Sequence, residues 1–558
     1  MRRELGDLQG REFDLVVVGG GISGLCAAWD ASQRGLSVAL LESRDFAHAA
    51  SANSFKMIHG GIRYLQHADL VRVRTSARER RALLRIAPHL TRPLPIFIPT
   101  YGHGLKGREI LMAGMKLYDL LTADRNRGIP DRARHIPAAR SVSRARALEL
   151  FPDLHPSGLT GGAVFHDGQM VSPARLALAF GSSAAKLGAV LANHCEVTEL
   201  LRDRQAIRGV VARDRLEDRW FEVRGRVVLN AAGGWAPDLL ASSPPLGLRP
   251  RPVFSRDACF FVRRAHPASM ALAVTGSSRD PQAVFSRSAR HLFLVPWRGG
   301  TLVGVWHAVW DRDPSAARVT EPELLEWIGE INAAMPGLAL GLGDVALTQC
   351  GLVLFAENEP GASNLKYGHR SLIVDHARAD GVEGLITLVS VRYTIARTEA
   401  ARVTDLVFQK LGRRPPPCRT GETRLFGGDF ESFDELVRDA RRQSGASLPQ
   451  AAVEGLAHNH GSNFPAVLSL AREAGGAMLL VPGSNTLEAE ILHAVRSEAA
   501  RTLSDVVLRR TDLGAAGHPG AAALETAATL MAKELHWDAT RRQKELDVTS
   551  AAFPALTP

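Results

Sequence analysis

The chain has 558 residues, which at about 100–200 residues per domain predicts two to four domains. Hydrophobic residues make up 45% of it and charged residues 23%, which excludes a largely disordered, collagen-like or coiled-coil protein. The net charge is +10, and only eight of the 68 basic residues are lysine.

The positive charge favours an anionic small molecule or a membrane surface as partner over nucleic acid. Basic residues gather around residues 125–146, but no aromatic residues alternate with them as on a nucleic-acid stacking surface. The five cysteines are widely spaced and form no CxxC pair, so we expect neither a metal site nor disulfides. The sequence shows no leader and no apolar run of about 18 residues, which predicts a cytoplasmic protein.

The first predicted elements are a strand, a helix and a second strand within residues 13–42. Residues 13–18 are an apolar, β-branched run typical of a buried strand, and they lead directly into a glycine-rich turn. A helix follows and ends at Gly35, and the second strand, residues 37–41, ends at Glu42. This order and spacing indicate a dinucleotide-binding fold.

The residue types in this turn match the chemistry of a dinucleotide. Gly19 permits the tight turn, Gly21 lets the backbone approach a pyrophosphate, and Gly24 allows the helix to pack closely on the strand. The helix N-terminus presents N–H groups to the phosphates. Glu42 stands 18 residues after Gly24, where a carboxylate accepts hydrogen bonds from ribose hydroxyls.

Further strands are predicted downstream. Residues 226–235 form an apolar strand that ends in small residues, which lets the backbone lie close to a ligand. Residues 252–354 are rich in strand-like runs and predict a β-rich domain inserted into the dinucleotide-binding one. Another apolar strand, residues 384–390, is followed by a helix over residues 395–411.

The last quarter of the chain is predicted to be helical. Three prolines at residues 415–417 indicate a stiff linker before it. The clearest helical pattern covers residues 488–509, and the Gly/Ala-rich residues 514–523 predict that the chain frays after it.

Several motifs together resemble the FAD-dependent glycerol-3-phosphate dehydrogenase family. The matching pieces are GGGISG at residues 19–24, Glu42 with Asp45 and Ala47, Ser51 and Ser54, Lys56, HGGIRYL at residues 59–65, residues 87–90, residues 230–235, residues 488–499, Asp505 and residues 509–511. HGGIRYL is far more specific than the glycine-rich turn. The similarity covers most of residues 13–515, and the sequence is identified as a member of this family.

The resemblance implies an α/β protein with a glutathione-reductase-like FAD-binding domain, an inserted β-rich substrate domain and a C-terminal helical domain. In chain order we expect the first part of the FAD-binding domain at residues 1–100, a helical connecting segment at 101–160, the second FAD-binding part at 161–245, the substrate domain at 246–355, the last FAD-binding part at 356–412 and the helical domain at 413–558.

The resemblance also implies an activity. A hydride passes from C2 of sn-glycerol 3-phosphate, or of a related polyol phosphate, to flavin N5, which gives dihydroxyacetone phosphate or the corresponding ketone. A quinone or oxygen then accepts the electrons. FAD is the expected cofactor, and a homodimer is a further expectation. Two alternatives stay open: oxidation of another small, non-phosphorylated alcohol, and an FAD-binding module without catalysis.

The residues expected at FAD come from the matching positions and the adjoining turns. They are Gly19, Gly21, Ser23, Gly24, Glu42, Ser51, Ser54, Lys56, His59, Gly60, Gly61, Val197, Ala232, Gly233, Trp235, Arg392, Tyr393 and Thr394.

The residues expected at the substrate are His59, Arg63, Tyr64, His307, Arg370 and Arg392. Hydride transfer needs the substrate C–H held near the flavin and a base for the hydroxyl proton. His59 or His307 is the candidate base, and the three arginines would stabilise the developing alkoxide. The alternative for each residue is structural: a core histidine, a surface cation or a half-buried aromatic ring, and for Lys56 a solvated charge.

The sequence departs from the family where the substrate is held. The family's Gly-Val-Arg-Pro element is replaced by residues 351–354, so that Val353 stands in place of an arginine. Its Gly-Gly-Lys-Leu-Thr-Thr segment corresponds to residues 390–395, which keep a cation as Arg392. A Thr-Thr-Asp element is replaced by residues 305–307. Since phosphate recognition favours arginine, these changes leave the identity of the substrate open.

Residues 105–121 form a candidate membrane-surface segment. Their apolar positions cover a broad helical face, and Lys106, Arg108 and Lys116 flank it. The favoured interpretation is a core helix that packs on the FAD domain. The alternative is an amphipathic helix in the headgroup region, which would make the protein peripheral on the inner membrane face.

Overall fold

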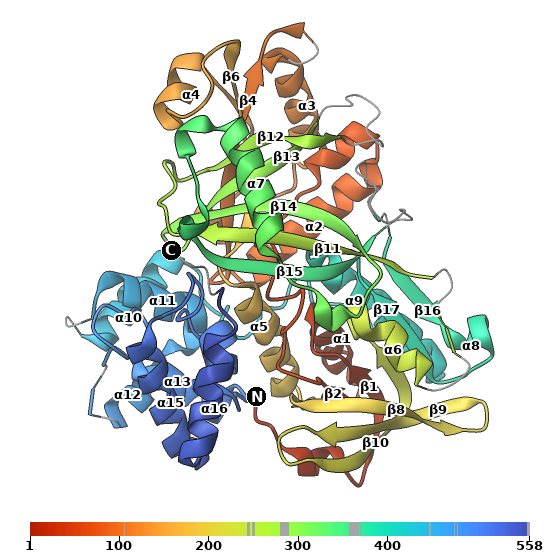
Figure 1. The fold of residues 1–558 in the computed structure, drawn as a ribbon. Coiled ribbons are helices and arrows are strands. Elements are labelled where there is room, and N and C mark those ends of the chain that lie inside the picture. Colours follow the sequence, from red (N-terminus) through yellow and green to blue (C-terminus); the bar gives the residue numbers. More distant parts are fainter. Residues whose placement is uncertain are drawn as a thin grey trace.

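Two β-sheets and a C-terminal group of helices make up the chain (Figure 1). The structure is a computed structural model and describes residues 1–104, 107–242, 246–247, 251–279, 289–355, 368, 370–445, 448–473, 475–476 and 478–554.

The first sheet contains the predicted strand–helix–strand unit. Its strands run in the order β16-β17-β10-β1-β2-β7, and β8 and β9 extend it from β10. Their bounds are β1 Glu12–Val18, β2 Val38–Leu41, β7 Val190–Ala192, β8 Cys195–Asp203, β9 Ala206–Asp214, β10 Arg219–Asn230, β16 Leu372–Asp375 and β17 Leu385–Val389. The central strand β1 is parallel to both β2 and β10. The structure therefore confirms the parallel core that the sequence predicts.

Side chains of β1 alternate between two hydrophobic clusters. Leu15 and Val17 pack against helices α1 (Ile22–Gln33), α5 (Pro173–Lys186) and α9 (Ala396–Lys410). Val16 and Val18 face the opposite cluster, which includes α6 (Ala236–Ala241). Because β1 is buried on both faces, its sequence is a continuous apolar run and not an alternating one.

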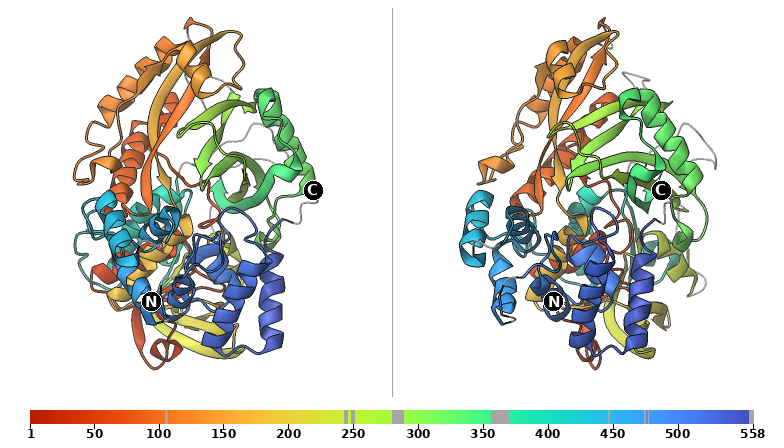
Figure 2. Two further views of the ribbon diagram at one scale, coloured as in Figure 1. Left: turned by 90° about the vertical axis from the view of Figure 1, so that its left-hand side faces the viewer. Right: turned by 60° about the vertical axis from the view of Figure 1, so that its left-hand side comes forward.

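The second sheet is the β-rich one. Its strands run in the order β15-β11-β14-β13-β12-β4-β6-β3, and β5 pairs with β6. Their bounds are β3 Met57–Ile58, β4 Thr91–Tyr101, β5 Arg140–Val142, β6 Leu159–Met170, β11 Val253–Val262, β12 Ala271–Arg279, β13 Ala289–Trp297, β14 Gly300–Trp310 and β15 Val345–Phe355. Helix α7 (Glu321–Ala334) crosses the outer face of this sheet (Figure 2).

Strands β4 and β6 cross the domain boundaries expected at residues 100 and 161. Strands β4 and β6 lie in ranges assigned to the FAD-binding domain and the connecting segment, but both belong to the second sheet. β4 contains Pro93, Pro95 and Pro99, residues that usually argue against a central strand. The three prolines are an even number of residues apart, so the hydrogen-bond donors that they lack would all be on the same side of β4. On that side β12 pairs with β4 only at Ile96 and Phe97. Pairing with β6 along the other side stays intact.

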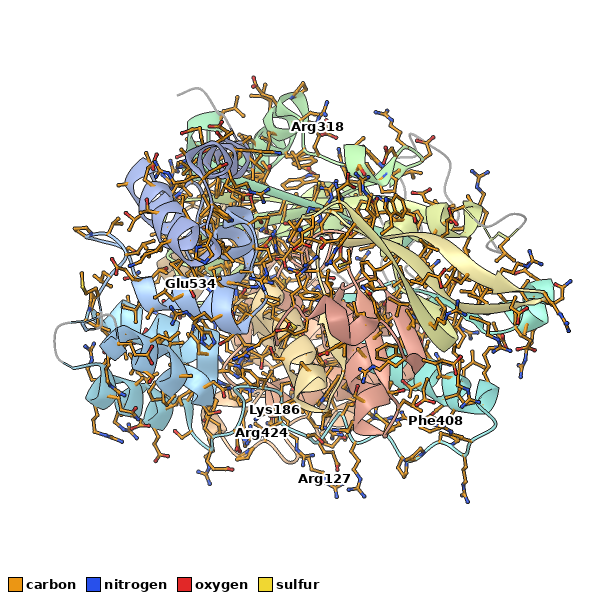
Figure 3. The ribbon with its side chains drawn as sticks, turned by 90° about the horizontal axis from the view of Figure 1, so that it is seen from below. Arg127, Lys186, Arg318, Phe408, Arg424 and Glu534 are labelled. Carbon is orange, nitrogen blue, oxygen red and sulfur yellow. The ribbon has the colours of Figure 1, made fainter. Side chains whose placement is uncertain are left out.

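The C-terminal domain is helical, as predicted. Its helices are α10 Phe433–Ser444, α11 Gln450–His460, α12 Phe464–Glu473, α13 Glu488–Ser497, α14 Leu503–Asp505, α15 Ala521–Leu535 and α16 Ala539–Ser550. Seen from below, these helices lie beside the first sheet's helices (Figure 3), and Lys186 at the end of α5 lies 5.5 Å from the ring centre of Phe426. The backbone N–H of Phe426 donates to Ser183 Oγ of α5 at 2.9 Å, which fixes this junction.

Two predictions for this domain are wrong. The helix expected over residues 488–509 is interrupted after Ser497, and a π-helix, Val506–Arg510, follows α14. The interruption places Glu498 inward, where it pairs with Arg175 of α5 at 2.6 Å. The chain also does not fray after residue 514, because α15 and α16 pack against the second sheet's core through Leu524 and Leu546.

Buried charges join the C-terminal domain to the loop that follows β2. The carboxylate of Asp45 is 1% exposed and pairs with both Arg509 and Arg510, the second at 2.7 Å through Nη2. Asn193 Nδ2 donates to the same carboxylate at 2.9 Å. Burial alone would raise the pKa of Asp45, but the charges of Arg510 and Arg509 lower it below its ordinary value.

Helix α3 (Arg108–Leu121) falls between the two interpretations of its segment. Met115 and Tyr118 are buried, so one face packs on the protein as a core helix does. Ile110, Leu117 and Leu120 are 51%, 50% and 73% exposed, so the opposite face is apolar and uncovered. Leu105 and Lys106 lie outside the described residues. Within the described chain, no helix combines the length and hydropathy that a membrane span requires.

We expect Asp45→Asn to destabilise the protein by about 3–5 kcal/mol, because it removes the carboxylate that pairs with buried Arg510 and one of the two carboxylates that pair with Arg509. Chemical denaturation compares the variant with the parent. Asp218→Asn, which breaks an exposed pair with Arg213, serves as the control and is expected to leave the unfolding midpoint in place. Equal midpoints for Asp45→Asn and the parent would contradict the assigned role of this cluster.

Candidate active site

A cavity of about 1280 Å³ lies where the first sheet meets the second. Val18, Ala231 and Leu388 reach it from the carboxyl ends of β1, β10 and β17. Asp257 and His307 reach it from the second sheet. Ligands of open α/β sheets bind at the carboxyl ends of the strands, so the position of this cavity is that of a ligand site.

Glycines shape the edge of the cavity at the start of α1. Gly19 has φ +107°, and a Cβ there would lie 2.7 Å from the carbonyl oxygen of Ala231. A Cβ on Gly24 would overlap the carbonyl oxygen of Gly19. Gly21 stands at the N-cap of α1 and has no side chain to cap the helix. The helix N-terminus therefore faces the cavity as an anion site.

Polar groups surround this helix end. Glu42 Oε2 accepts from the Gly20 N–H at 2.7 Å, and burial raises the pKa of Glu42 above its ordinary value. Ser51 Oγ accepts from the Ile22 N–H at 2.9 Å. Ser54 Oγ is buried in the lining and has no hydrogen-bond partner among the described residues. These groups offer hydrogen bonds to a dinucleotide.

Most residues expected at FAD line this one cavity. They are Gly19, Gly21, Ser23, Glu42, Ser51, Ser54, His59, Gly61, Val197, Ala232, Gly233, Trp235, Arg392, Tyr393 and Thr394. The cavity brings them together from distant parts of the chain, and their contacts with FAD stay a prediction.

Lys56, Gly60 and Gly24 do not line the cavity. The Lys56 ammonium donates to Gln349 and lies 4.9 Å from the ring centre of Trp297, and burial lowers its pKa to about 8. Because Lys56 is buried, it is not the solvated charge of the alternative interpretation, and its contact with FAD stays a prediction. A Cβ on Gly60 would overlap Arg80 and Tyr118, so this glycine serves packing. Gly24 serves the helix–strand packing predicted for it.

Cations gather around Tyr64 on one wall of the cavity. Arg392 Nη1 donates to Tyr64 Oη at 2.6 Å and to Ser76 Oγ at 3.2 Å. The guanidinium groups of Arg72 and Arg392 lie 4.5 and 5.0 Å from the ring centre of Tyr64. Arg63 also lines the cavity, and its charge acts on His291 of β13. Planar guanidinium groups suit phosphate, so this wall is suited to an anionic substrate.

His59 forms a pair with a carboxylate that the sequence did not indicate. His59 Nδ1 lies 3.4 Å from Asp167 Oδ2, and half of the His59 side chain is exposed. Asp167 is buried and also accepts from Arg80 and from the Gly60 N–H, both at 2.6 Å. Burial would raise the pKa of Asp167, but His59 and Arg80 lower it. Asp167 therefore stays ionised and can orient the His59 ring.

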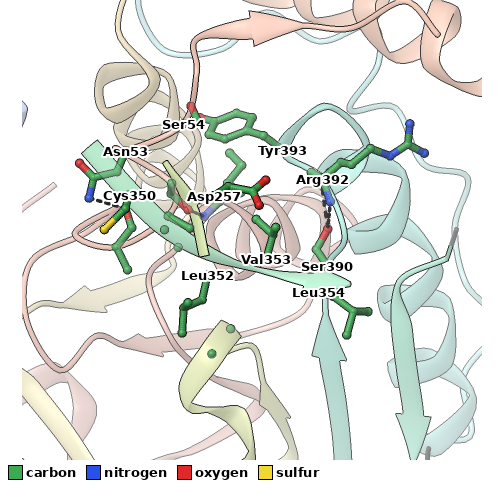
Figure 4. A pocket seen from close by; sticks show the side chains of 18 of the residues that line it. Asn53, Ser54, Asp257, Cys350, Leu352, Val353, Leu354, Ser390, Arg392 and Tyr393 are labelled. Atoms are coloured by element: carbon green, nitrogen blue, oxygen red, sulfur yellow. Dashed lines mark hydrogen bonds between the residues drawn. The ribbon is translucent and has the colours of Figure 1, made fainter. Parts of the chain in front are cut away.

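His307 forms a second pair, on the sheet side of the cavity. Its Nδ1 lies 2.7 Å from Asp257 Oδ1, and its ring stacks on Phe355. Figure 4 shows Asp257 and Val353 on this wall and Ser54 with Tyr393 across from them. Val353 thus lines the cavity, where the resemblance places an arginine.

Arg370 is not where we expected it. Its side chain is exposed and is absent from the cavity lining. It stands just before β16, at the edge of the first sheet, and the substrate role expected for it stays a prediction. Arg370 was chosen because the resemblance implies an arginine retained before residues 371–373, and a match of this kind does not determine the direction of a side chain.

Comparisons with known proteins agree on one family. Residues 14–379 match the family described as FAD dependent oxidoreductase, and residues 418–542 match the C-terminal domain of alpha-glycerophosphate oxidase. The chain is 30% identical over 522 residues to a glycerol-3-phosphate dehydrogenase of Synechocystis sp., covering 91% of this chain and 90% of that protein. It is 31% identical to glycerol-3-phosphate dehydrogenase 2 of Mycobacterium tuberculosis, covering 96% and 87%.

A solved structure shares the fold. The glycerol-3-phosphate dehydrogenase from Bacillus halodurans, complexed with FAD, matches with a TM-score of 0.74 at 24% identity. The match covers 98% of this chain and 95% of that one.

We expect Gly21→Val to abolish dinucleotide retention, because its side chain would fill the space over the α1 N-terminus beside Ser51 Oγ. The ratio of bound dinucleotide to purified, folded protein measures the effect. Gly329→Ala, in an exposed part of α7 with open space around it, is the matched control and should keep full occupancy. Stoichiometric dinucleotide in Gly21→Val would show that the pyrophosphate lies elsewhere.

Proposed function

The chain belongs to the FAD-dependent glycerol-3-phosphate dehydrogenase family, and from this we propose that it oxidises the C2 hydroxyl of sn-glycerol 3-phosphate or a related polyol phosphate to the ketone. The observation that carries the proposal is the group of arginines around Tyr64, which adjoins the dinucleotide cradle in one cavity. With sn-glycerol 3-phosphate the product is dihydroxyacetone phosphate.

FAD is the cofactor, and the cavity suits it. The N-terminus of α1, where glycine is the N-cap residue, is suited to the pyrophosphate, and Glu42 is placed to accept from ribose hydroxyls. The unpartnered Ser54 Oγ offers one more hydrogen bond. FAD, when bound, supplies the hydride acceptor of the reaction.

The chain's own residues would bind the substrate and remove a proton. Arg63 and Arg392 attract the phosphate, and Tyr64 is held in place by its bond to Arg392. His59, oriented by Asp167 through Nδ1, would accept the hydroxyl proton at Nε2. The electron acceptor would be a quinone or oxygen.

Val353 favours a second candidate function, the oxidation of a non-phosphorylated alcohol. Its apolar side chain lines the cavity and offers phosphate no hydrogen bond. The cations around Tyr64 favour the phosphorylated substrate, so the two candidates differ in what they require of Arg63.

Anaerobic sn-glycerol 3-phosphate should bleach the visible flavin absorbance of the purified holoprotein, whereas glycerol should not. Arg63→Ala should keep FAD and lower kcat/KM for sn-glycerol 3-phosphate by about 10²–10³-fold, since it removes a charged donor. Arg78→Ala, an exposed position of α2 (Leu70–Ile86) outside the cavity lining, is the control. Bleaching by glycerol alone would favour the second candidate, and unchanged turnover in Arg63→Ala would remove Arg63 from the site.

We further propose that the uncovered face of α3 rests on an anionic membrane. Leu70 and Val71, both exposed, begin α2 one turn before Arg74, whose guanidinium donates to the Leu121 carbonyl at 2.6 Å. The apolar surface of α3 therefore continues onto α2. Lys116 is exposed on α3 and can meet acidic headgroups.

Flotation with anionic liposomes tests the membrane proposal. The protein should float at low salt and less at high salt, because a short apolar face needs electrostatic support. A Leu117→Ser, Leu120→Ser double variant should float less, and Leu325→Ser, which removes an equally exposed leucine on α7, should not change flotation. Protein that stays in the soluble fraction at both salt concentrations would contradict the proposal.

A further inference from the structure

The two walls of the cavity differ in charge. The wall around Tyr64 carries Arg72 and Arg392, and Arg63 also lines the cavity. The opposite wall is the face of β11, β14 and β15 on which Asp257 pairs across the strands with His307 and with Gly351. Arg256, the next residue along β11, points to the other face and pairs with Glu323 of α7. Among the described residues, the cavity face of these three strands thus carries a carboxylate and an imidazole and no guanidinium.

The sheet wall is held close to the cofactor cradle at two points. Ala50, on the loop that carries Ser51, packs so tightly on Gly351 that a Cβ there would meet the Ala50 backbone. The ring of Phe55 packs on Gly304 of β14, where a Cβ would lie 3.1 Å from it. A substrate bound beside the cradle therefore has this wall on one side.

The hydrogen bond to Asp257 determines which ring nitrogen of His307 carries the proton. An ionised carboxylate only accepts, so the 2.7 Å contact to Asp257 Oδ1 places the imidazole proton on Nδ1. Ser255 Oγ donates to the same oxygen at 2.7 Å and steadies it. The ring also stacks on Phe355 with an interplanar angle of 16°. In the neutral ring, Nε2 is then the acceptor.

We propose that His307, oriented by Asp257, accepts a hydrogen bond from the substrate hydroxyl farthest from the phosphate and thereby selects polyol phosphates with a hydroxyl beyond the reacting carbon. In sn-glycerol 3-phosphate this is the C1 hydroxyl. The assignment rests on the proposed function, which places the phosphate at Arg63 and Arg392. An anionic group is disfavoured on the sheet wall because it would face the charge of Asp257 and the apolar Val353.

A pair of substrates tests this assignment. The compounds are sn-glycerol 3-phosphate and the matching phosphate of propane-1,2-diol, which keeps the reacting hydroxyl and the phosphate but lacks the C1 hydroxyl. A site that hydrogen-bonds a hydroxyl rejects the analogue without it, so the parent holoenzyme should prefer sn-glycerol 3-phosphate by about 10²-fold in kcat/KM. His307→Phe keeps the ring and its stacking and should reduce the preference to a few-fold, chiefly through loss with sn-glycerol 3-phosphate.

Controls separate specificity from structure. Asp257→Asn should weaken the preference in the same direction, and His155→Phe, at an exposed position outside the cavity lining, should leave it unchanged. FAD content and the flavin spectrum report whether each variant keeps its fold. In anaerobic rapid mixing, the dependence of the bleaching rate on the concentration of each compound gives its apparent Kd, which separates affinity from the reduction step.

The outcomes distinguish this assignment from the proposed function. Equal losses with both compounds in His307→Phe would place His307 at the reacting carbon or in the fold, and an unchanged preference would remove it from the site. Either result overturns the assignment and leaves the proposed function standing. A parent enzyme that neither binds nor is reduced by the two compounds overturns both.

Discussion

The buried carboxylate of Asp45 is the contact on which the site depends. It lies between Arg509 and Arg510 of the π-helix and the amide of Asn193, and it therefore joins the C-terminal domain to the loop after β2. That loop carries Ser51 to the start of α1 and Ala50 to Gly351 of the second sheet. One network thus determines how the dinucleotide cradle, the substrate sheet and the C-terminal helices meet. Removing a buried partner from such a network is costly, because the remaining charges cannot be solvated.

The cavity at this junction has chemically distinct sides. The α1 N-terminus suits a pyrophosphate, the arginines around Tyr64 suit an anionic substrate, and two histidine–carboxylate pairs stand on different walls. Asp167 and Asp257 each hold a histidine Nδ1, which leaves Nε2 as the acceptor. The two pairs can therefore serve different substrate groups: His59 the reacting hydroxyl, and His307 a second one.

The parts of this arrangement that the sequence predicts are local. The strand–helix–strand unit follows from the spacing of Gly19, Gly21, Gly24 and Glu42, because that geometry is set within about 30 residues. The division of the strands between the two sheets is harder to predict from the sequence. β4 and β6 join the second sheet through pairings that no local sequence pattern specifies. The sequence also did not predict that the side chain of Lys56 contacts Gln349 and lies outside the cavity lining that its neighbours form.

The sequence also did not predict the carboxylate partners of the two histidines, because each pair joins residues that are far apart in the chain. Asp167 is 108 residues from His59, and Asp257 is 50 residues from His307, so neither pair forms a motif. The only sequence signal for Asp257 is its place in an apolar strand, where an unpaired carboxylate would be costly.

The most direct test of the account is the rate at which sn-glycerol 3-phosphate bleaches the flavin in anaerobic rapid mixing, compared with the same substrate deuterated at C2. The account predicts slower bleaching with deuterium at C2 and an unchanged rate with deuterium at C1, because the C2–H bond breaks in that step. Equal rates for the C2-deuterated and unlabelled substrates, or no bleaching at all, would contradict it.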